Sequence, residues 1–120
     1  MTKADDRRLT RITKIALALP DATREDHPSH AIFRVKKKVF AYWLDDHHTD
    51  GIFSVAVKVA PGESEQLVKD EPAVFYSPAY IGSRGWVGVR LDGKSVDWAR
   101  VAALIEASHA ATAAKKKPRR

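Results

Sequence analysis

Three strand-like segments follow one another between residues 31 and 59, with only short turns between them. They read AIFRV, KVFAYWL and GIFSVAVKV, and β-branched and aromatic residues dominate all three. The segments that join them, KK or KKK and DDHHTDG, are rich in charged and turn-forming residues. Neither connection has room for the crossover helix that joins parallel strands. The sequence therefore predicts an antiparallel meander at the centre of the fold.

Helical patterns surround this meander. The first helix is predicted over residues 3–19, with Asp5 and Asp6 in its first turn and Pro20 at its end. Its apolar stripe is Leu9, Ile12, Ala16 and Leu19. A second helix is predicted within PGESEQLVKDEP, between Pro61 and Pro72. The polar segment DATREDHPSH between the first helix and the meander has room for one short edge strand.

The last third of the chain repeats this alternation of strand and helix. AVFYSPAY precedes a strand at residues 86–91, and a final helix is predicted from Ser95, the expected N-cap, with Asp97 in its first turn. The buried face of this helix is predicted to be Trp98, Val101, Ala102 and Ile105. The order helix–strands–helix–strands–helix favours an α+β fold, a two-layer structure with an antiparallel sheet and helices packed on one face.

Alternation along the strands sorts their side chains into two faces. The face predicted to meet the helices carries Phe33, Val35, Phe40, Tyr42, Leu44, Phe53, Val55, Val57, Val59, Val87, Val89 and Leu91. The predicted outer face carries Ile32, Arg34, Val39, Ala41, Trp43, Ile52, Ser54, Ala56, Lys58, Trp86, Gly88 and Arg90. The core is predicted to include Phe33, Phe40, Phe53, Val55, Val87, Val89, Trp98 and Ile105.

The predicted outer face mixes two tryptophans with cations, which is unusual for a solvated sheet. Such a mixture fits stacking on bases with phosphate contacts alongside. It equally fits the centre of a protein–protein or homodimer interface. A third interpretation is structural, with a loop or helix end covering the face and both tryptophans buried.

The charge of the chain is concentrated at its end. The formal net charge is +6, but the last six residues, KKKPRR, hold five of the 21 basic side chains, and residues 1–114 are nearly neutral. We expect one domain over residues 1–114 and a disordered basic tail over residues 115–120, which attracts phosphate or only aids solubility. The charged N-terminus and the lack of a long apolar run predict a cytoplasmic protein without membrane contact.

The sequence offers no convincing catalytic or metal-binding pattern. The absence of cysteine excludes disulfides and thiolate metal sites. DDHHTD and the pair His27 and His30 lack fixed ligand spacing, and Ser83 in GSRG does not stand in a Gly-x-Ser-x-Gly elbow. The amides of residues 82–85 can cup an anion beside Arg84, although a plain strand-entry turn explains both glycines better. We therefore expect no enzyme activity, no cofactor and no metal.

Three stretches carry a resemblance to a known family. FRVKKKVFAYW, VAVKV before a proline-started helix, and SPAYIGSRGWVGVRLDG before the last helix resemble the MmcQ/YjbR-like family of small bacterial proteins. ALALPDATREDHP also fits the start of its members, so the resemblance covers about residues 5–110. It implies a compact α+β fold similar to that of secretion chaperones. Family members are called predicted DNA-binding proteins with a double-wing motif, and no catalytic set comes with the resemblance.

One position departs from this family. Members often have glycine at the first hairpin turn, where φ is positive, whereas this chain has Lys36 and Lys37. Either the loop is longer than two residues, or a lysine adopts a left-handed conformation. If the hairpin is a wing, its lysines can contact phosphate. The predicted function is weak, salt-dependent DNA binding, and the candidate contact residues are Arg34, Lys36, Lys37, Lys38, Lys58, Arg84, Trp86 and Arg90.

Overall fold

The computed structural model describes residues 7–45, 53–78, 85–91 and 96–114. Within these ranges the chain forms three helices and six strands. The helices are α1 (Arg7–Leu17), α2 (Glu63–Asp70) and α3 (Trp98–Ala114). The strands are β1 (Ala22–His27), β2 (His30–Val35), β3 (Lys38–Asp45), β4 (Phe53–Lys58), β5 (Phe75–Tyr76) and β6 (Trp86–Arg90). The predicted α+β class and element order are confirmed, and the polar segment after α1 does form an edge strand.

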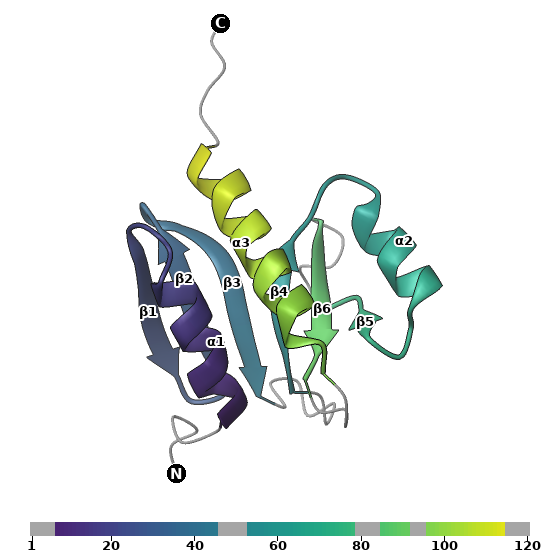
Figure 1. Cartoon of the computed structure of the whole chain (residues 1–120), viewed down its shortest axis with the longest axis horizontal. Coiled ribbons are helices and arrows are strands. Elements are labelled where there is room, and N and C mark those ends of the chain that lie inside the picture. The colour runs from purple at the N-terminus through teal and green to yellow at the C-terminus, as the bar shows by residue number, and fades with distance from the viewer. Residues whose placement is uncertain (1–6, 46–52, 79–84, 92–95, 115–120) are drawn as a thin grey trace, which may run out of the picture.

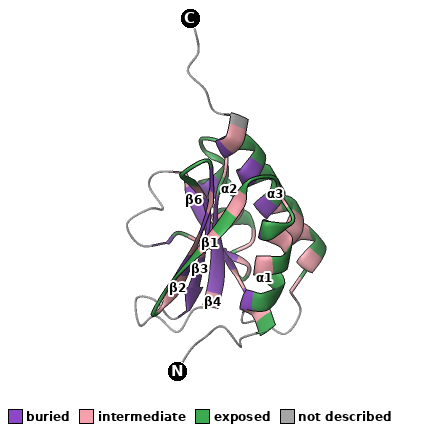
Figure 2. Ribbon diagram, turned by 90° about the vertical axis from the view of Figure 1, so that its left-hand side faces the viewer, coloured by how far each residue is buried: buried purple, intermediate pink, exposed green. Residues whose placement is uncertain are grey.

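The strands form one antiparallel sheet in the order β1-β2-β3-β4-β6-β5. Helices α1 and α3 lie on the same face of this sheet, as the two perpendicular views in Figure 1 and Figure 2 show. Helix α2 contacts β5 and β6, at the opposite end of the sheet from β1. The sheet therefore has one face covered by α1 and α3, and a second face, called here the outer face, that neither of these helices covers.

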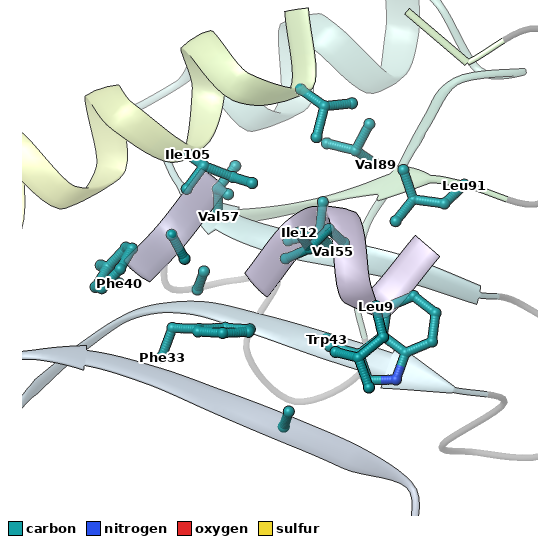
Figure 3. Close-up of a cluster of buried hydrophobic side chains, with 14 of the residues drawn as sticks. Leu9, Ile12, Phe33, Phe40, Trp43, Val55, Val57, Val89, Leu91 and Ile105 are labelled. Carbon is teal, nitrogen blue, oxygen red and sulfur yellow. The ribbon is translucent and has the colours of Figure 1, made fainter. Parts of the chain in front are cut away.

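The core lies between α1, α3 and the covered face of the sheet (Figure 3). Helix α1 inserts Leu9, Ile12 and Ala16 of the predicted stripe, and the last two are completely buried. The helix ends at Leu17, so Leu19, the fourth predicted residue, lies beyond it and is only partly buried. Most of the predicted core residues are buried, including Phe33, Phe40 and Ile105. Phe53 and Trp98 are only partly buried and pack at the margin of the same cluster. Apolar burial on this scale is the main term that stabilises a domain of this size.

A β-bulge in β3 changes which side chains face the core. Phe33 pairs with Ala41, but its neighbour Arg34 pairs with Val39, so Phe40 is an extra residue in β3. Phe40 and Ala41 consequently both face the core, and both are fully buried. A bulge shifts the two-residue alternation by one position for every residue that follows it.

The assignment of the β3 residues to faces was therefore wrong after Phe40. Trp43 belongs to the core cluster and is 1% exposed, instead of lying on the outer face with Trp86. Tyr42 and Leu44, expected in the core, pack with Trp86 on the outer face. The outer face thus carries one tryptophan among the described residues, not two.

A serine on α3 completes the hydrogen bonding of the bulge. The bulge ends the regular β3–β4 register, whose last pair at this end is Ala41 with Val57. The hydroxyl of Ser108 donates to the carbonyl oxygen of Phe40 at 2.7 Å and accepts from the amide of Lys58 at 3.0 Å. Ser108 is completely buried, and its hydroxyl satisfies both backbone groups where solvent does not reach. Ser108 therefore joins α3 to the two central strands.

The start of α3 also differs from the prediction. The helix begins at Trp98, and the carbonyl of Asp97 accepts the first helical hydrogen bond, from Val101. The Asp97 carboxylate accepts from the amide of Arg100 at 3.1 Å, so Asp97 is the N-cap. Ser95, expected to be the N-cap, lies outside the described residues, as do Asp5 and Asp6 at the start of the predicted first helix.

Candidate functional site

The hairpin between β2 and β3 turns through two lysines. Val35 pairs with Lys38, so the loop consists of Lys36 and Lys37 alone. Their φ angles are 50° and 74°, the left-handed values of a type I′ turn. Of the two alternatives left open by the sequence, the left-handed conformation is correct, and it applies to both lysines. This conformation is unfavourable by roughly 1–2 kcal/mol for a residue with a Cβ atom.

The lysines of this hairpin are open to solvent and carry uncompensated charge. Lys36, Lys37 and Lys38 are all exposed. Within the described ranges, no carboxylate forms an ion pair with any of them or with Lys58. Three arginines behave differently, because Arg24, Arg34 and Arg100 are paired with Asp26, Glu25 and Glu71 respectively. The positive charge of the hairpin is thus available to a partner.

The hairpin adjoins the end of α3. Lys38 and Lys58 line one open groove together with Ala111 and Thr112 from the last turns of α3. Helix α3 ends at Ala114, and the basic segment 115–120 follows it directly in the sequence. That segment lies outside the described residues. One end of the molecule therefore holds the lysines of the hairpin, Lys58 and the C-terminal end of α3 (Figure 1).

Arg34 lies on the outer face but is engaged by a neighbouring strand. Its guanidinium donates to the carboxylate of Glu25, which also contacts the Nε2 atom of His27 at 2.6 Å. The hydrogen bonds from Arg34 and then from His27 hold the pKa of Glu25 below its ordinary value of 4.5. Glu25 therefore stays ionised near neutral pH and offsets the charge that Arg34 would offer to a phosphate.

Trp86 lies on the outer face, as predicted, but it is largely covered. It pairs with Lys58 across β4 and β6 and is 7% exposed. Its ring lies 5.2 Å from that of Tyr42, and the Lys58 ammonium lies 6.0 Å from its centre. In this arrangement little of the indole surface is open to a nucleobase. Trp86 packs chiefly against Tyr42, Leu44 and Ala56 of its own sheet.

Arg90 belongs to a small cluster of side chains around Gly88. Gly88 is directly opposite Tyr76, and a Cβ atom at Gly88 would lie 2.3 Å from the tyrosine ring. The Tyr76 hydroxyl hydrogen-bonds the hydroxyl of Ser54 at 2.6 Å, and the Arg90 guanidinium lies 5.3 Å from the ring centre. Gly88 is therefore needed for the close approach of this ring, and Arg90 is held over it.

The predicted contact residues thus divide into two groups. Lys36, Lys37, Lys38 and Lys58 share one end of the sheet and have no ion-pair partner among the described residues. Arg34, Trp86 and Arg90 sit on the outer face and are each engaged by neighbours. Arg84 lies outside the described residues.

Two residues that shape this site were not predicted from the sequence. Tyr76 was not singled out, although a glycine in a strand interior is a signal of close packing from a neighbouring strand. Tyr42 was assigned to the core because no local signal marks the bulge at Phe40.

The other candidate residues from the sequence either have structural roles or lie outside the described residues. Gly85 has a φ of 90°, and its carbonyl accepts from the amide of Val59 at 2.9 Å, so this glycine shapes the entry into β6. The rings of His27 and His30 stack at 4.6 Å. Residues 82–84, and all of DDHHTD except Asp45, are outside the described ranges. In the described part of the chain no cluster of three potential metal ligands occurs, and no helix is long and apolar enough to cross a membrane.

These features define a class of protein: a small α+β domain whose antiparallel sheet is covered by two helices on one face and ends in a lysine-tipped hairpin. Comparison with known families gives the class a name. The YjbR family model matches residues 17–111, and the chain belongs to this family.

A solved structure supports the fold independently. The chain is similar to the crystal structure of Deinococcus radiodurans protein DR2400, described as a DUF419 domain, with a TM-score of 0.72 and 21% sequence identity. The match covers 90% of this chain and 80% of the other, and at this identity it speaks for the fold alone. No curated protein matches the chain.

Proposed function

We propose that this YjbR-family protein binds DNA through phosphate contacts made by the β2–β3 hairpin, and that it is a binding protein without enzyme activity. The observation that carries the proposal is the hairpin tip, where three consecutive exposed lysines lack any ion-pair partner among the described residues. Lysines that neutralise phosphates release counterions, which gives affinity without sequence preference.

The conformation of the turn supports the proposal. A two-residue type I′ turn is rigid, so Lys36 and Lys37 project from a fixed end of the sheet. Lysine is a poor choice for such a turn on conformational grounds, because Asn-Gly satisfies it better. A residue kept in an unfavourable conformation is more readily explained by function than by stability.

The groove beside the hairpin carries charges of both signs. Lys58 lines it with Lys38, and so do Glu63 and Glu65 from the first turn of α2. The segment KKKPRR begins directly after α3, which lines the groove as well. We expect this segment to add non-specific affinity, because it has five positive charges and no apolar side chain. Deleting residues 115–120 should weaken DNA binding and leave the thermal midpoint unchanged. A loss of several degrees would instead mean that the segment stabilises the folded domain.

The absence of catalysis is part of the same proposal. Three described buried serines have a hydrogen-bonded hydroxyl: Ser108 joins α3 to the bulge, Ser54 bonds Tyr76 across the sheet, and Ser64 donates to the carboxylate of its neighbour Glu65 at 3.4 Å. An activated nucleophile would need a base within hydrogen-bond reach. Among the described residues, Ser108 and Ser54 have neither a histidine nor a carboxylate as partner, and the carboxylate that Ser64 contacts is that of the adjacent residue, at 3.4 Å.

A double substitution of the turn tests the proposal. Lys36→Asn with Lys37→Gly removes two charges and supplies the residues that a type I′ turn prefers, so weaker binding cannot be blamed on unfolding. Lys69→Glu is the matched control, since it changes the net charge by the same two units in the last turn of α2, which contacts β5 and β6 at the sheet edge opposite β1. We expect the turn variant to bind a mixed-sequence DNA duplex more weakly than the control.

The same samples also test the alternative use of the outer face as a protein or homodimer contact. This use has less support, because Trp86 is 7% exposed and Leu44 is 8% exposed. The molecular mass in solution distinguishes the two functions. A stable dimer that fails to bind DNA at low salt would overturn the proposal in favour of the interface.

A further inference from the structure

A second set of cations lies on α1, away from the hairpin turn. Arg7, Arg11 and Lys14 recur at intervals of four and three residues, so they share one side of the helix, and all three are exposed. The opposite side of the helix packs into the core through Leu9, Ile12 and Ala16. We refer to Arg7, Arg11 and Lys14 as the α1 cationic face.

The charge of this face is not neutralised within the described chain. Helix α1 contains no acidic residue, and in the ranges the structure covers no carboxylate pairs with Arg7, Arg11 or Lys14. This contrasts with Arg24 and Arg100, each of which is held by a carboxylate. The α1 cationic face therefore keeps its full positive charge.

Arg11 is held in place by an aromatic ring instead of a carboxylate. Its guanidinium lies 4.6 Å from the centre of the Trp98 ring, at the start of α3. Stacking on a ring orients a guanidinium while leaving the N–H groups at its edge free to donate. Those donors match the oxygens of a phosphate, which an arginine can bind through two parallel hydrogen bonds.

The geometry of the row suits a regular polyanion. Seven residues separate Arg7 from Lys14, which is about 10.5 Å along a helix axis. One strand of a DNA duplex advances about 3.4 Å per nucleotide, so the row spans roughly three nucleotide steps. A protein partner would require apolar or aromatic contacts at the centre of its interface. Among the described residues, Leu17 is the only large apolar side chain that is exposed.

We infer that the α1 cationic face is a second phosphate-binding surface, which contacts the backbone of duplex DNA in addition to the hairpin. The inference rests on the proposed function, because it assigns a further contact surface for the same partner. Contacts of this kind position the duplex and do not read its sequence.

The test is Arg11→Gln with Lys14→Gln in the full chain, compared with Lys69→Glu. The substituted side chains are exposed, so we expect only the small fall in thermal midpoint that loss of the Arg11–Trp98 contact explains. The probe is a mixed-sequence DNA duplex of about 25 base pairs, titrated at about 50 mM and about 200 mM salt. Losing two phosphate contacts should make the slope of log affinity against log salt less steep, by about 1.8. Between those two salt concentrations the variant should therefore lose about 12-fold less affinity than the parent protein.

The outcomes separate this inference from the proposed function. If the parent protein binds the duplex and the α1 variant matches the Lys69→Glu control in affinity and slope, the α1 surface is not a contact and the inference is overturned. If the α1 variant loses affinity while the turn variant does not, the inference stands and the hairpin proposal fails. If the parent protein does not bind the duplex at about 50 mM salt, both are overturned.

Discussion

Replacing Ser108 with alanine should destabilise the fold far more than the loss of one small side chain implies. The Ser108 hydroxyl serves two backbone groups at once, donating to the Phe40 carbonyl at 2.7 Å and accepting from the Lys58 amide at 3.0 Å. Alanine at this position leaves both groups without that partner. The bulge prevents them from bonding each other as they would in a regular ladder.

The magnitude follows from the burial of these groups. A buried backbone group left without a hydrogen bond destabilises a protein by about 1–3 kcal/mol. The site is buried at the Phe40 carbonyl and only partly buried at the Lys58 amide, so we take the lower end for the amide. The sum is about 2–4 kcal/mol, a large fraction of the roughly 5–15 kcal/mol that stabilises a typical domain. For a chain of this length it corresponds to a fall in Tm on the order of 10 °C.

Thr112 provides a matched control on the same helix, one turn later. It is also buried, but its Oγ1 atom has no hydrogen-bond partner among the described residues. Thr112→Val removes that hydroxyl at nearly constant volume and should be neutral or stabilising. Urea unfolding of both variants measures the two free energies. If Ser108→Ala and Thr112→Val change stability by the same amount, the serine does not support the bulge and this reasoning is refuted.

Three further predictions concern stability. Lys36→Asn with Lys37→Gly should raise the free energy of unfolding in urea by about 1 kcal/mol, because both lysines have positive φ. A lower urea midpoint than that of the parent protein would contradict the type I′ turn. Gly88→Ala should destabilise by about 1–3 kcal/mol, because the added Cβ atom displaces the Tyr76 ring; thermal unfolding at the parent Tm would show that the ring is not fixed. The arginine partner on α3 holds the pKa of Glu71 below 4.5, so its contribution to stability is present above that pH and is lost as the pH falls through the lowered value. Tm measured from pH 6 to pH 3 should therefore fall less in Glu71→Gln than in the parent protein, and equal falls would contradict the pairing.

The element order was predictable because each element carries its own signal. The apolar stripe of α1 through Leu9, Ile12 and Ala16, and the alternating strands of the meander, are properties of neighbouring residues. The bulge at Phe40 depends instead on a serine 68 residues later in the chain. No local pattern contains that information, so the faces of Tyr42 and Trp43 were inverted.

In the candidate site, too, features set by neighbouring residues were predictable and features set by distant residues were not. The position of the turn was predictable, because the lysines separate two strand-like segments, whereas its length of two residues came from the structure. The pairing of Arg34 with Glu25 was not predictable, since it depends on the register of β1 against β2. The burial of Trp86 was one of three interpretations of the sequence, but its cause was not predictable, because it results from the shifted alternation that brings Tyr42 beside it.

The most direct test of the central claim is the salt dependence of duplex DNA binding by the parent protein and by the variant with Lys36→Asn and Lys37→Gly. If these lysines contact phosphates, the parent protein binds at low salt, and the slope of log affinity against log salt is smaller in the variant by about 1.8. Equal slopes for the two proteins would contradict the claim that the hairpin binds DNA.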